Sequence, residues 1–321
     1  MYNPRLVHGC NLSQKETHKT KYLDADSRRF LSEIRVRYDE WYKANAELRG
    51  PLAEQSKEDS GILRKRVELF EEYKEFIDQQ HYAEKFDSRS NLHSSVIEEF
   101  MFYLFRDLIQ EFGSHALIGK SHAFKDVFFT PPNYREMLVR PFARIERKDH
   151  DFVIGATYVA SFDAETPPVE ENGTENVESR VEETPGSYEE VAVTEDAESH
   201  LFDIPAVAIE CKTYLDKTML EGSSRAAEEL KARHPNGLYI VVMEWIKLTE
   251  AVNPRKYKVD QIYILRKQKN TDREFRYLES YKKNLVAVDV VEHLFETVRQ
   301  HLTTDWSGGI ASSLDRGWLI G

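Results

Sequence analysis

The sequence predicts an α/β protein in which a mixed central β-sheet is flanked by helices and preceded by an N-terminal helical region. Residues 24–112 carry apolar side chains at helical spacing. The second half of the chain holds short, nearly continuous apolar runs, which are typical of strands buried on both faces. The 321 residues are 40% hydrophobic and 31% charged, which excludes a fibrous or wholly disordered protein.

We expect helices to make up the N-terminal region 1–90 and the beginning of a core region 91–302. Two helices fit residues 24–90 and are interrupted near Gly50 and Pro51. Their apolar stripes are Phe30, Ile34, Tyr38, Trp41 and Tyr42 in the first helix and Leu63, Val67, Phe70, Tyr73 and Ile77 in the second. A third helix is expected over 92–112, with Gly113 as its stop.

The core region then changes to strands. The apolar or β-branched runs that predict them are 151–158, 204–211, 238–243 and 261–265. Residues 216–233 predict a helix between the second and third runs, and such a crossover joins two parallel strands. A last helix is expected at about 288–301, and the Gly- and Ser-containing residues 303–321 predict a loose tail.

The acidic residues gather in one segment, 165–198. Its twelve acids and single base give a net charge of -11, against -12 for the whole chain. Because it holds Pro and Gly and scarcely any large apolar residue, it cannot bury enough surface to offset the cost of ordering. We expect a disordered insertion between two strands, so the total charge says little about binding partners.

The cysteines and the hydropathy pattern predict a cytoplasmic protein with no membrane partner. Cys10 and Cys211 cannot staple a secreted scaffold or complete a four-ligand zinc site by themselves. The first residues lack a basic stretch followed by a long apolar run, and the chain has no run of eighteen apolar residues.

The chemistry is expected at Glu210 and Lys212. The pattern Glu-x-Lys occurs four times in the chain, but only this copy ends an apolar strand. Because residues i and i+2 of a strand point to the same side, Glu210 and Lys212 project together, while Cys211 faces the other way. Burying such a pair costs desolvation energy, and apolar residues would often stabilise the fold as well or better. The pair is therefore better explained by a chemical role than by a structural one.

A second carboxylate lies at the start of the preceding predicted strand, 151–158. Asp151 abuts this strand directly, and Asp149 is its rival. Asp151 and Glu210 are 59 positions apart, of which 34 belong to the acidic insertion, so about 25 remain. This separation suits neighbouring strands joined by a turn, which would bring two carboxylates and one lysine together.

These residues resemble the PD-(D/E)XK nuclease superfamily. With the runs 91–100, 148–155 and 210–220, the chain looks most like its type II restriction endonucleases, over about residues 90–265. The resemblance implies that Asp151, Glu210 and the backbone carbonyl of Cys211 hold Mg²⁺, a cation that prefers hard oxygen ligands. Lys212 would position or deprotonate the attacking water.

The resemblance also implies an additional glutamate from the preceding helix. Glu98 is the first candidate for this role and Glu99 the second. The sequence departs from the superfamily pattern in having His150 where a proline often precedes the Asp, which keeps Asp149 open as the alternative metal ligand.

The implied function is Mg²⁺-dependent, sequence-specific cleavage of double-stranded DNA, alongside a cognate DNA methyltransferase. Two cuts need two active sites, so a homodimer or heterodimer is expected. The alternatives are a nicking or junction-specific repair or recombination nuclease, and a non-catalytic DNA-binding subunit. The segment after Lys212 enters the crossover helix beside the site, so Tyr214 and Lys217 are the candidate DNA contacts; base-reading residues cannot be named from spacing.

Overall fold

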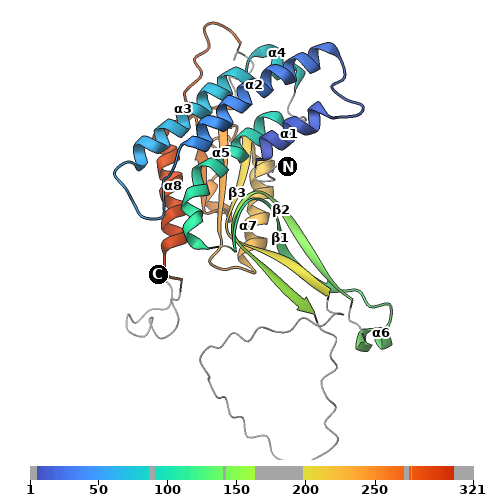
Figure 1. The fold of residues 1–321 in the computed structure, drawn as a ribbon. Coiled ribbons are helices and arrows are strands. Elements are labelled where there is room, and N and C mark those ends of the chain that lie inside the picture. Colours follow the sequence, from blue (N-terminus) through green and yellow to red (C-terminus); the bar gives the residue numbers. More distant parts are fainter. Residues whose placement is uncertain are drawn as a thin grey trace, which may run out of the picture.

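The computed structural model describes residues 6–86, 91–113, 115–139, 142–162, 198–270, 275 and 277–306 (Figure 1). The predicted acidic insertion, apart from Glu198, and the predicted tail beyond residue 306 lie outside the described residues. The helices are α1 (Val7–Glu16), α2 (Ala25–Glu47), α3 (Asp59–Ile77), α4 (Gln80–Lys85), α5 (Leu92–Ile109), α6 (Tyr134–Val139), α7 (Lys217–Lys231) and α8 (Val288–Thr303). The strands are β1 (Ala116–Phe129), β2 (Ala143–Phe162), β3 (Glu198–Leu215), β4 (Leu238–Ile246) and β5 (Gln261–Ile264).

The five strands form one mixed sheet in the order β1-β2-β3-β4-β5. The pairs β1–β2 and β2–β3 are antiparallel, whereas β3–β4 and β4–β5 are parallel. Helix α7 connects the two parallel strands β3 and β4, and the side chain of Asp216 caps its first turn by accepting from the Met219 N–H. The predicted fold class, a mixed central sheet flanked by helices, is confirmed.

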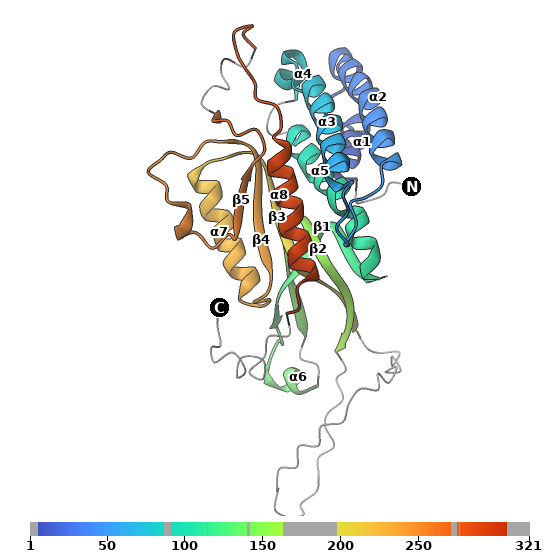
Figure 2. The same cartoon turned by 90° about the vertical axis from the view of Figure 1, so that its left-hand side faces the viewer.

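Alternate residues of the central strands supply two hydrophobic clusters on opposite faces of the sheet. Ile209 and Val242 pack in the cluster shared with α5 and α8, whereas Ala208 and Val241 pack in the cluster under α7. All four are fully buried. Figure 2 shows the layers, with α7 on one side of the sheet and α5 and α8 on the other. This double cover explains why these strands read as continuous apolar runs.

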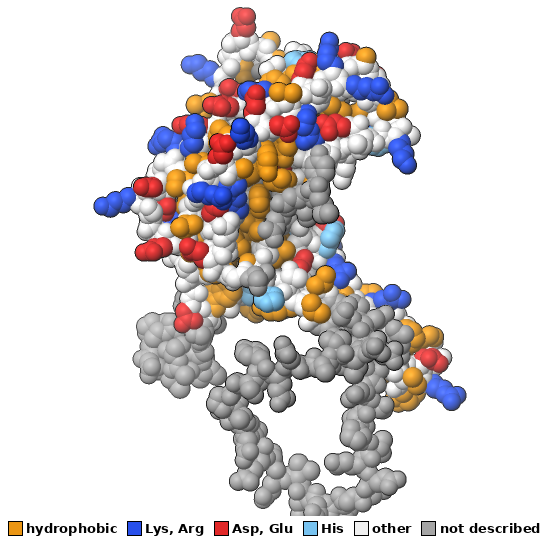
Figure 3. All heavy atoms as spheres, in the orientation of Figure 1, with side chains coloured by type: hydrophobic (Ala, Val, Ile, Leu, Met, Phe, Trp, Pro, Cys, Tyr) orange, Lys and Arg blue, Asp and Glu red, His pale blue; other side chains and the backbone are white. Residues whose placement is uncertain are grey.

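Helices α1 to α4 form an outer layer beyond α5 (Figures 1 and 2). The predicted stripe of α3 is buried along its whole length, whereas in the α2 stripe Phe30 is half-buried and Tyr42 is exposed. On the face drawn in Figure 3, acidic and basic side chains are interspersed over this layer. None of the helices in the described part of the chain is both long and apolar enough to cross a membrane.

A buried charge network ties this outer layer to the sheet. The Arg266 guanidinium lies 2.7 Å from Glu244 on β4 and 2.8 Å from Glu71 on α3. Lys74 of α3 lies 3.1 Å from the second oxygen of Glu244. Arg266, Glu244 and Lys74 are fully buried, so each charge depends on its partners for the stabilisation that water would otherwise supply.

The far ends of β1, β2 and β3 extend beyond the helical layers as an arm that carries α6 near its tip (Figure 1). All six residues of α6 are exposed. Both β1 and α6 are elements that the sequence analysis did not predict, as are α1 and α4. Strand β1 lacks a clean alternation because two register shifts interrupt its pairing with β2.

The register shift nearest the body of the molecule is a β-bulge in β2. Gly119 pairs with Val153, and Ser121 pairs with His150, so Asp151 and Phe152 together lie opposite Lys120 alone. A bulge bends its strand and re-aims the side chains beside it. Here the bulge re-aims the side chain of Asp151. Asp151 is also the first residue of the strand predicted over 151–158.

A second irregularity brings the backbones of β2 and β3 unusually close. Ile154 pairs with Val207 and Gly155 pairs with Pro205, so Ala206 is the additional residue on β3. A Cβ atom on Gly155 would lie 2.1 Å from the carbonyl oxygen of Ile204, and backbone cannot yield as a flexible side chain does. Glycine at 155 is therefore a steric requirement of this pairing.

We expect the substitution Gly155→Ala to lower the free energy of unfolding by roughly 1–3 kcal/mol, the usual cost of overpacking. The measurement is urea unfolding followed by circular dichroism. The matched control is Gly61→Ala in α3, where a Cβ would meet nothing within 4 Å; it should gain up to about 1 kcal/mol of helix propensity. Equal stabilities of Gly155→Ala and the parent chain would contradict the close approach.

Candidate active site

The candidate site lies where β2 and β3 stop pairing with each other. The last pair of their ladder at this end is Phe152 with Ile209, and the next residues are Asp151 and Glu210. The backbone N–H of Cys211 donates a hydrogen bond of 2.9 Å to Oδ2 of Asp151. A carboxylate thus occupies the position in which a strand would offer its carbonyl, and it fixes Asp151 against β3.

The Lys212 ammonium bridges the two strand carboxylates. Its Nζ lies 2.7 Å from Oε1 of Glu210 and 3.1 Å from Oδ2 of Asp151. The three side chains are each about a quarter exposed, with relative exposures of 27% for Lys212, 22% for Glu210 and 24% for Asp151. Cys211 points into the core, as the strand alternation predicts. The structure therefore brings together the predicted Asp151, Glu210 and Lys212.

Mutual attraction keeps Glu210 and Lys212 ionised. Burial acts to raise the pKa of Glu210, but Lys212 and a 3.0 Å hydrogen bond from the Tyr239 hydroxyl outweigh it, so the pKa of Glu210 is lowered. Burial acts to lower the pKa of Lys212, yet Asp151 and Glu210 raise it above its usual value. At neutral pH Lys212 is consequently a hydrogen-bond donor held between Asp151 and Glu210.

The two predicted glutamates of α5 have different environments. Glu98 lines the same pocket as Asp151 and Lys212 and is 7% exposed. Its Oε2 atom is buried and has no hydrogen-bond partner among the described residues. Burial, followed by the negative charge of Asp151, raises the pKa of Glu98 to about 7. Among the described residues, the charge of the Glu98 carboxylate is therefore poorly compensated.

Glu99, the second choice from the sequence, faces away from the pocket, toward α1 and α2 of the helical layer. Its carboxylate accepts hydrogen bonds from the backbone of His8 and Gly9 and from the hydroxyls of Tyr38 and Tyr103. It is fully buried. Glu99 thus docks α1 and α2 onto α5, and its oxygens are engaged there rather than in the pocket.

Asp149, the rival of Asp151, points elsewhere. Its side chain is 69% exposed and forms a hydrogen bond with the His122 ring on β1. No contact joins it to Glu210 or Lys212 among the described residues. The geometry therefore places Asp151 in the cluster and Asp149 on the outer side of the β1–β2 hairpin.

The pocket over the cluster has a volume of about 370 Å³. Tyr214 lines it, and the Lys247 ammonium lies 5.3 Å from the centre of the Tyr214 ring. Lys217 lies in the first turn of α7, is 66% exposed and pairs with Glu221 at 3.7 Å. The lining residues are Asn91, His93, Ser94, Glu98, Lys120, Asp151, Cys211, Lys212, Thr213, Tyr214 and Met219.

The donor atoms of the site fit a hard divalent cation. Asp151 and Glu210 direct carboxylate oxygens at one point, the Nζ of Lys212. Asp151 and Lys212 line the pocket together with Glu98, whose Oε2 has no partner among the described residues, whereas Glu210 is not part of the lining. Oxygen donors of this kind suit Mg²⁺. No group of three His, Cys, Asp or Glu side chains in the described ranges is arranged to enclose a metal unaided, so further ligands would have to come from other groups.

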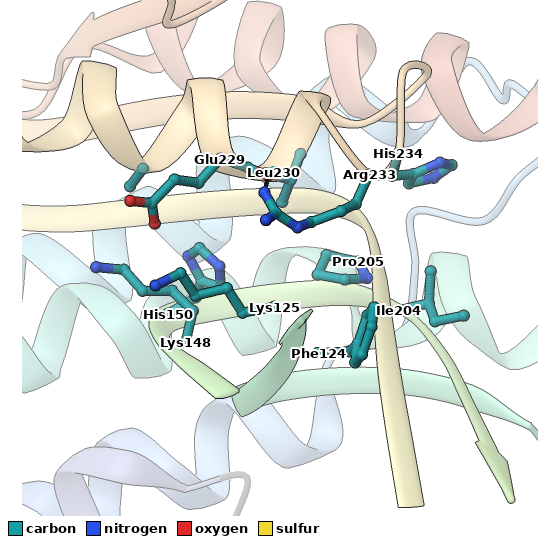
Figure 4. Close-up of a pocket in the computed structure, with 11 residues that line it drawn as sticks. Phe124, Lys125, Lys148, His150, Ile204, Pro205, Glu229, Leu230, Arg233 and His234 are labelled. Atoms are coloured by element: carbon teal, nitrogen blue, oxygen red, sulfur yellow. Dashed lines mark hydrogen bonds between the residues drawn. The ribbon is translucent and has the colours of Figure 1, made fainter. Parts of the chain in front are cut away.

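A smaller pocket of about 130 Å³ lies beside the site, between α7 and the β1–β2 hairpin (Figure 4). Lys125 and Lys148 of the hairpin and Arg233 after α7 line it. His150 also lines it, and burial lowers the pKa of this imidazole. The His150 ring packs against Tyr239 at 5.9 Å, so its neutral form supports the tyrosine that donates to Glu210.

Two residues of the site escaped the sequence analysis. Tyr239 donates to Glu210 from the neighbouring strand β4, and its signal is a hydroxyl within an otherwise aliphatic run. Lys120 reaches the pocket from β1. No local pattern identifies Lys120, because its position depends on the register of the β1–β2 hairpin.

The mixed sheet, its covering helices and the Asp, Glu and Lys cluster at the end of β2 and β3 define a restriction-endonuclease-like nuclease fold. The sequence model of the Bpu10I restriction endonuclease family matches residues 89–177 and 187–319. The chain therefore belongs to the Bpu10I restriction endonuclease family. The match begins just before α5 and leaves the helices α1 to α4 outside it.

A solved structure supports the same fold over nearly the whole chain. It is described as the native BbvCI A2B2 tetramer at low resolution, and it matches with a TM-score of 0.63 and 20% sequence identity. The match covers 94% of this chain and 97% of that chain, so it includes the N-terminal helices. No curated protein matches the sequence.

The raised pKa of Glu98 predicts a pH-dependent stability of the metal-free protein. The carboxyl binds its proton more tightly in the folded chain, where its pKa is about 7, than at its ordinary value of 4.5. The contribution of Glu98 protonation to the free energy of unfolding is therefore fully present below pH 4.5 and is lost as pH rises to about 7. The full loss is about 3 kcal/mol.

We therefore expect Glu98→Gln to raise the melting temperature in EDTA at pH 8 and to have little effect at pH 5. Thermal unfolding at the two pH values checks this. The matched control is Glu111→Gln, an exposed residue just beyond α5, which should change neither value. An unchanged melting temperature of Glu98→Gln at pH 8 would rule out the buried charge.

Proposed function

We propose that this chain is a Mg²⁺-dependent type II restriction endonuclease that hydrolyses phosphodiester bonds at specific sites in double-stranded DNA. The observation that carries the proposal is the Lys212 ammonium held between Asp151 and Glu210 at the wall of a pocket. Membership of the Bpu10I restriction endonuclease family supports the reaction class.

The chain would contribute carboxylates, a hydrogen-bond donor and exclusion of bulk water. Asp151 and Glu210, with the Cys211 carbonyl, would hold Mg²⁺, which when bound supplies charge neutralisation and an acidified water. Lys212 would donate to the attacking water or to the scissile phosphate and so orient it. In the metal-free chain Asp151 and Glu210 raise the pKa of Lys212, so its ammonium is present there as a positioned donor.

Glu98 would act on the same site from α5. Its Oε2 atom is buried without a partner among the described residues, and its pKa is raised. A positive charge brought into the pocket would therefore stabilise the ionised form of Glu98. We assign it to the support of the cation or the attacking water. Tyr214 in the pocket and Lys217 at the start of α7 are the proposed DNA contacts, the latter with a phosphate.

Cleavage of both DNA strands requires two such sites. The described part of this chain holds one cluster of this kind, so we propose that it acts as a dimer of like or unlike subunits. The structural neighbour described as an A2B2 tetramer makes an unlike partner a reasonable choice to test first. A cognate DNA methyltransferase would protect the host DNA, and both proteins would work in the cytoplasm.

Incubation with unmethylated phage DNA should give discrete fragments in Mg²⁺ and none in EDTA. Gel electrophoresis measures the fragments, and sequencing of their ends identifies the site. Mg²⁺-dependent nicks would indicate that a second subunit cuts the other strand, and nicking confined to branched or mismatched duplexes would favour a repair nuclease. Tight binding without any cut would favour the non-catalytic subunit.

The variant Lys212→Ala should lose at least about a hundredfold in the single-turnover cleavage rate, the scale of one positioned polar group in an active site. It should still bind the same DNA within a few fold. Lys231→Ala is a matched control, because Lys231 ends another Glu-x-Lys triplet but lies on α7 and pairs with Asp260. Cleavage by Lys212→Ala at the parental rate would refute the assignment.

A further inference from the structure

The structure places a second lysine at the pocket of the proposed nuclease. Lys120 lies on β1 directly opposite the bulge that contains Asp151 and Phe152. It lines the pocket together with Glu98 and Lys212, and its side chain is exposed. Lys120 therefore approaches the cluster from the strand that faces β3 across β2.

The backbone around Lys120 is held firmly. Its neighbours Gly119 and Ser121 are buried, and the Ser121 hydroxyl donates a 2.7 Å hydrogen bond to Asp203 on β3. Gly119 has a φ of 120°, a conformation that residues with a Cβ rarely adopt. The base of the Lys120 side chain is thus fixed by β1, while its ammonium is free to meet a ligand.

The charges of the pocket leave Lys120 available. The Lys212 ammonium is engaged by two carboxylates, and His93 contacts Asp78 at 3.1 Å. Lys120 has neither a hydrogen bond nor an ion pair within the described residues. Its positive charge is near enough to act on the Glu98 carboxyl. A basic side chain at the edge of an anionic cluster, with no ion pair among the described residues, suits an anionic substrate.

We propose that the Lys120 ammonium binds a non-bridging phosphate oxygen of the DNA strand that enters this pocket. The proposal rests on the proposed function, because it takes DNA as the substrate. Lys120 would offset the repulsion between the approaching phosphate and the carboxylates of Glu98 and Asp151. It is a binding residue for the strand to be cut, and it takes no part in proton transfer.

A purely structural role of Lys120 makes different predictions. If its ammonium only offset the charge of Glu98, its loss would alter the stability of the protein and leave the number of DNA phosphates neutralised unchanged. The salt dependence of DNA binding separates the two roles. Each phosphate neutralised by a lysine adds a slope of about -0.9 to a plot of log K against log salt concentration.

The experiment compares the parent chain with Lys120→Ala, Lys120→Arg and the control Lys43→Ala, an exposed lysine of α2 outside the pocket. The probe is a 30-bp duplex of about three helical turns spanning a cut mapped in phage DNA, bound in EDTA at several salt concentrations. Lys120→Ala should weaken binding roughly tenfold at low salt. It should also make the slope less negative by about 0.9, whereas Lys120→Arg and Lys43→Ala should keep the parental slope.

A second measurement tests direct contact. Neutral methylphosphonate replaces, one at a time, the scissile phosphate and the phosphates on either side of it. At one of these positions the binding loss of Lys120→Ala should disappear, because the charge that Lys120 meets has been removed. Equal salt slopes for Lys120→Ala and the parent chain, or a loss that persists at every position, would overturn the proposal.

The two proposals fail in distinguishable ways. If the parent chain binds DNA but cuts none, the proposed function fails, and the salt titration is run with a 30-bp duplex of random sequence of the same three-turn length. A slope change of about 0.9 in that duplex still supports the Lys120 contact. If the parent chain cuts and Lys120→Ala has the parental slope, the proposed function stands and the Lys120 contact is refuted.

Discussion

The hydrogen bond from the Cys211 N–H to the Asp151 carboxylate is the interaction on which the candidate site depends. Strands β2 and β3 diverge at this point, and without the bond neither strand would fix the position of the other's side chains. The bulge opposite Lys120 makes the bond possible, because it removes Asp151 from the regular ladder. The bulge therefore allows the Asp151 carboxylate to be held at a fixed distance from Cys211 near the end of β3.

Buried charged side chains have different partners in the body of the protein and at this site. In the body, Arg266 joins Glu244 and Glu71, and the Glu99 carboxylate accepts several hydrogen bonds. These contacts hold the helical layer on the sheet. At the site, the Oε2 atom of Glu98 has no hydrogen-bond partner among the described residues. This oxygen is therefore available to a bound cation or to a hydrogen-bond donor of a substrate.

Local pattern was sufficient for the central strands and the long helices, because both faces of the sheet are covered and each helix buries a stripe. The pair Glu210 and Lys212 followed from a Glu-x-Lys pattern at the end of an apolar strand, together with strand alternation. Strand β1 did not, because two register shifts interrupt its alternation. The same dependence on register hid Lys120, and Tyr239 required knowledge that β4 lies beside β3. Site residues supplied by a neighbouring strand are set by tertiary pairing, which no short stretch of sequence carries.

The β2–β3 ladder also separates the candidate site from the connection between the two strands. It runs without a break from the pair Phe152 and Ile209, next to the cluster, to the pair Phe162 and Glu198 on the arm, apart from the one shift at Gly155. Chain inserted beyond that far pair closes a loop between ends that already lie together, and the entropic cost of such a loop grows only logarithmically with its length. The far end of the hairpin is therefore a position at which sequence can be gained or lost during evolution, while the end next to the candidate site keeps its geometry.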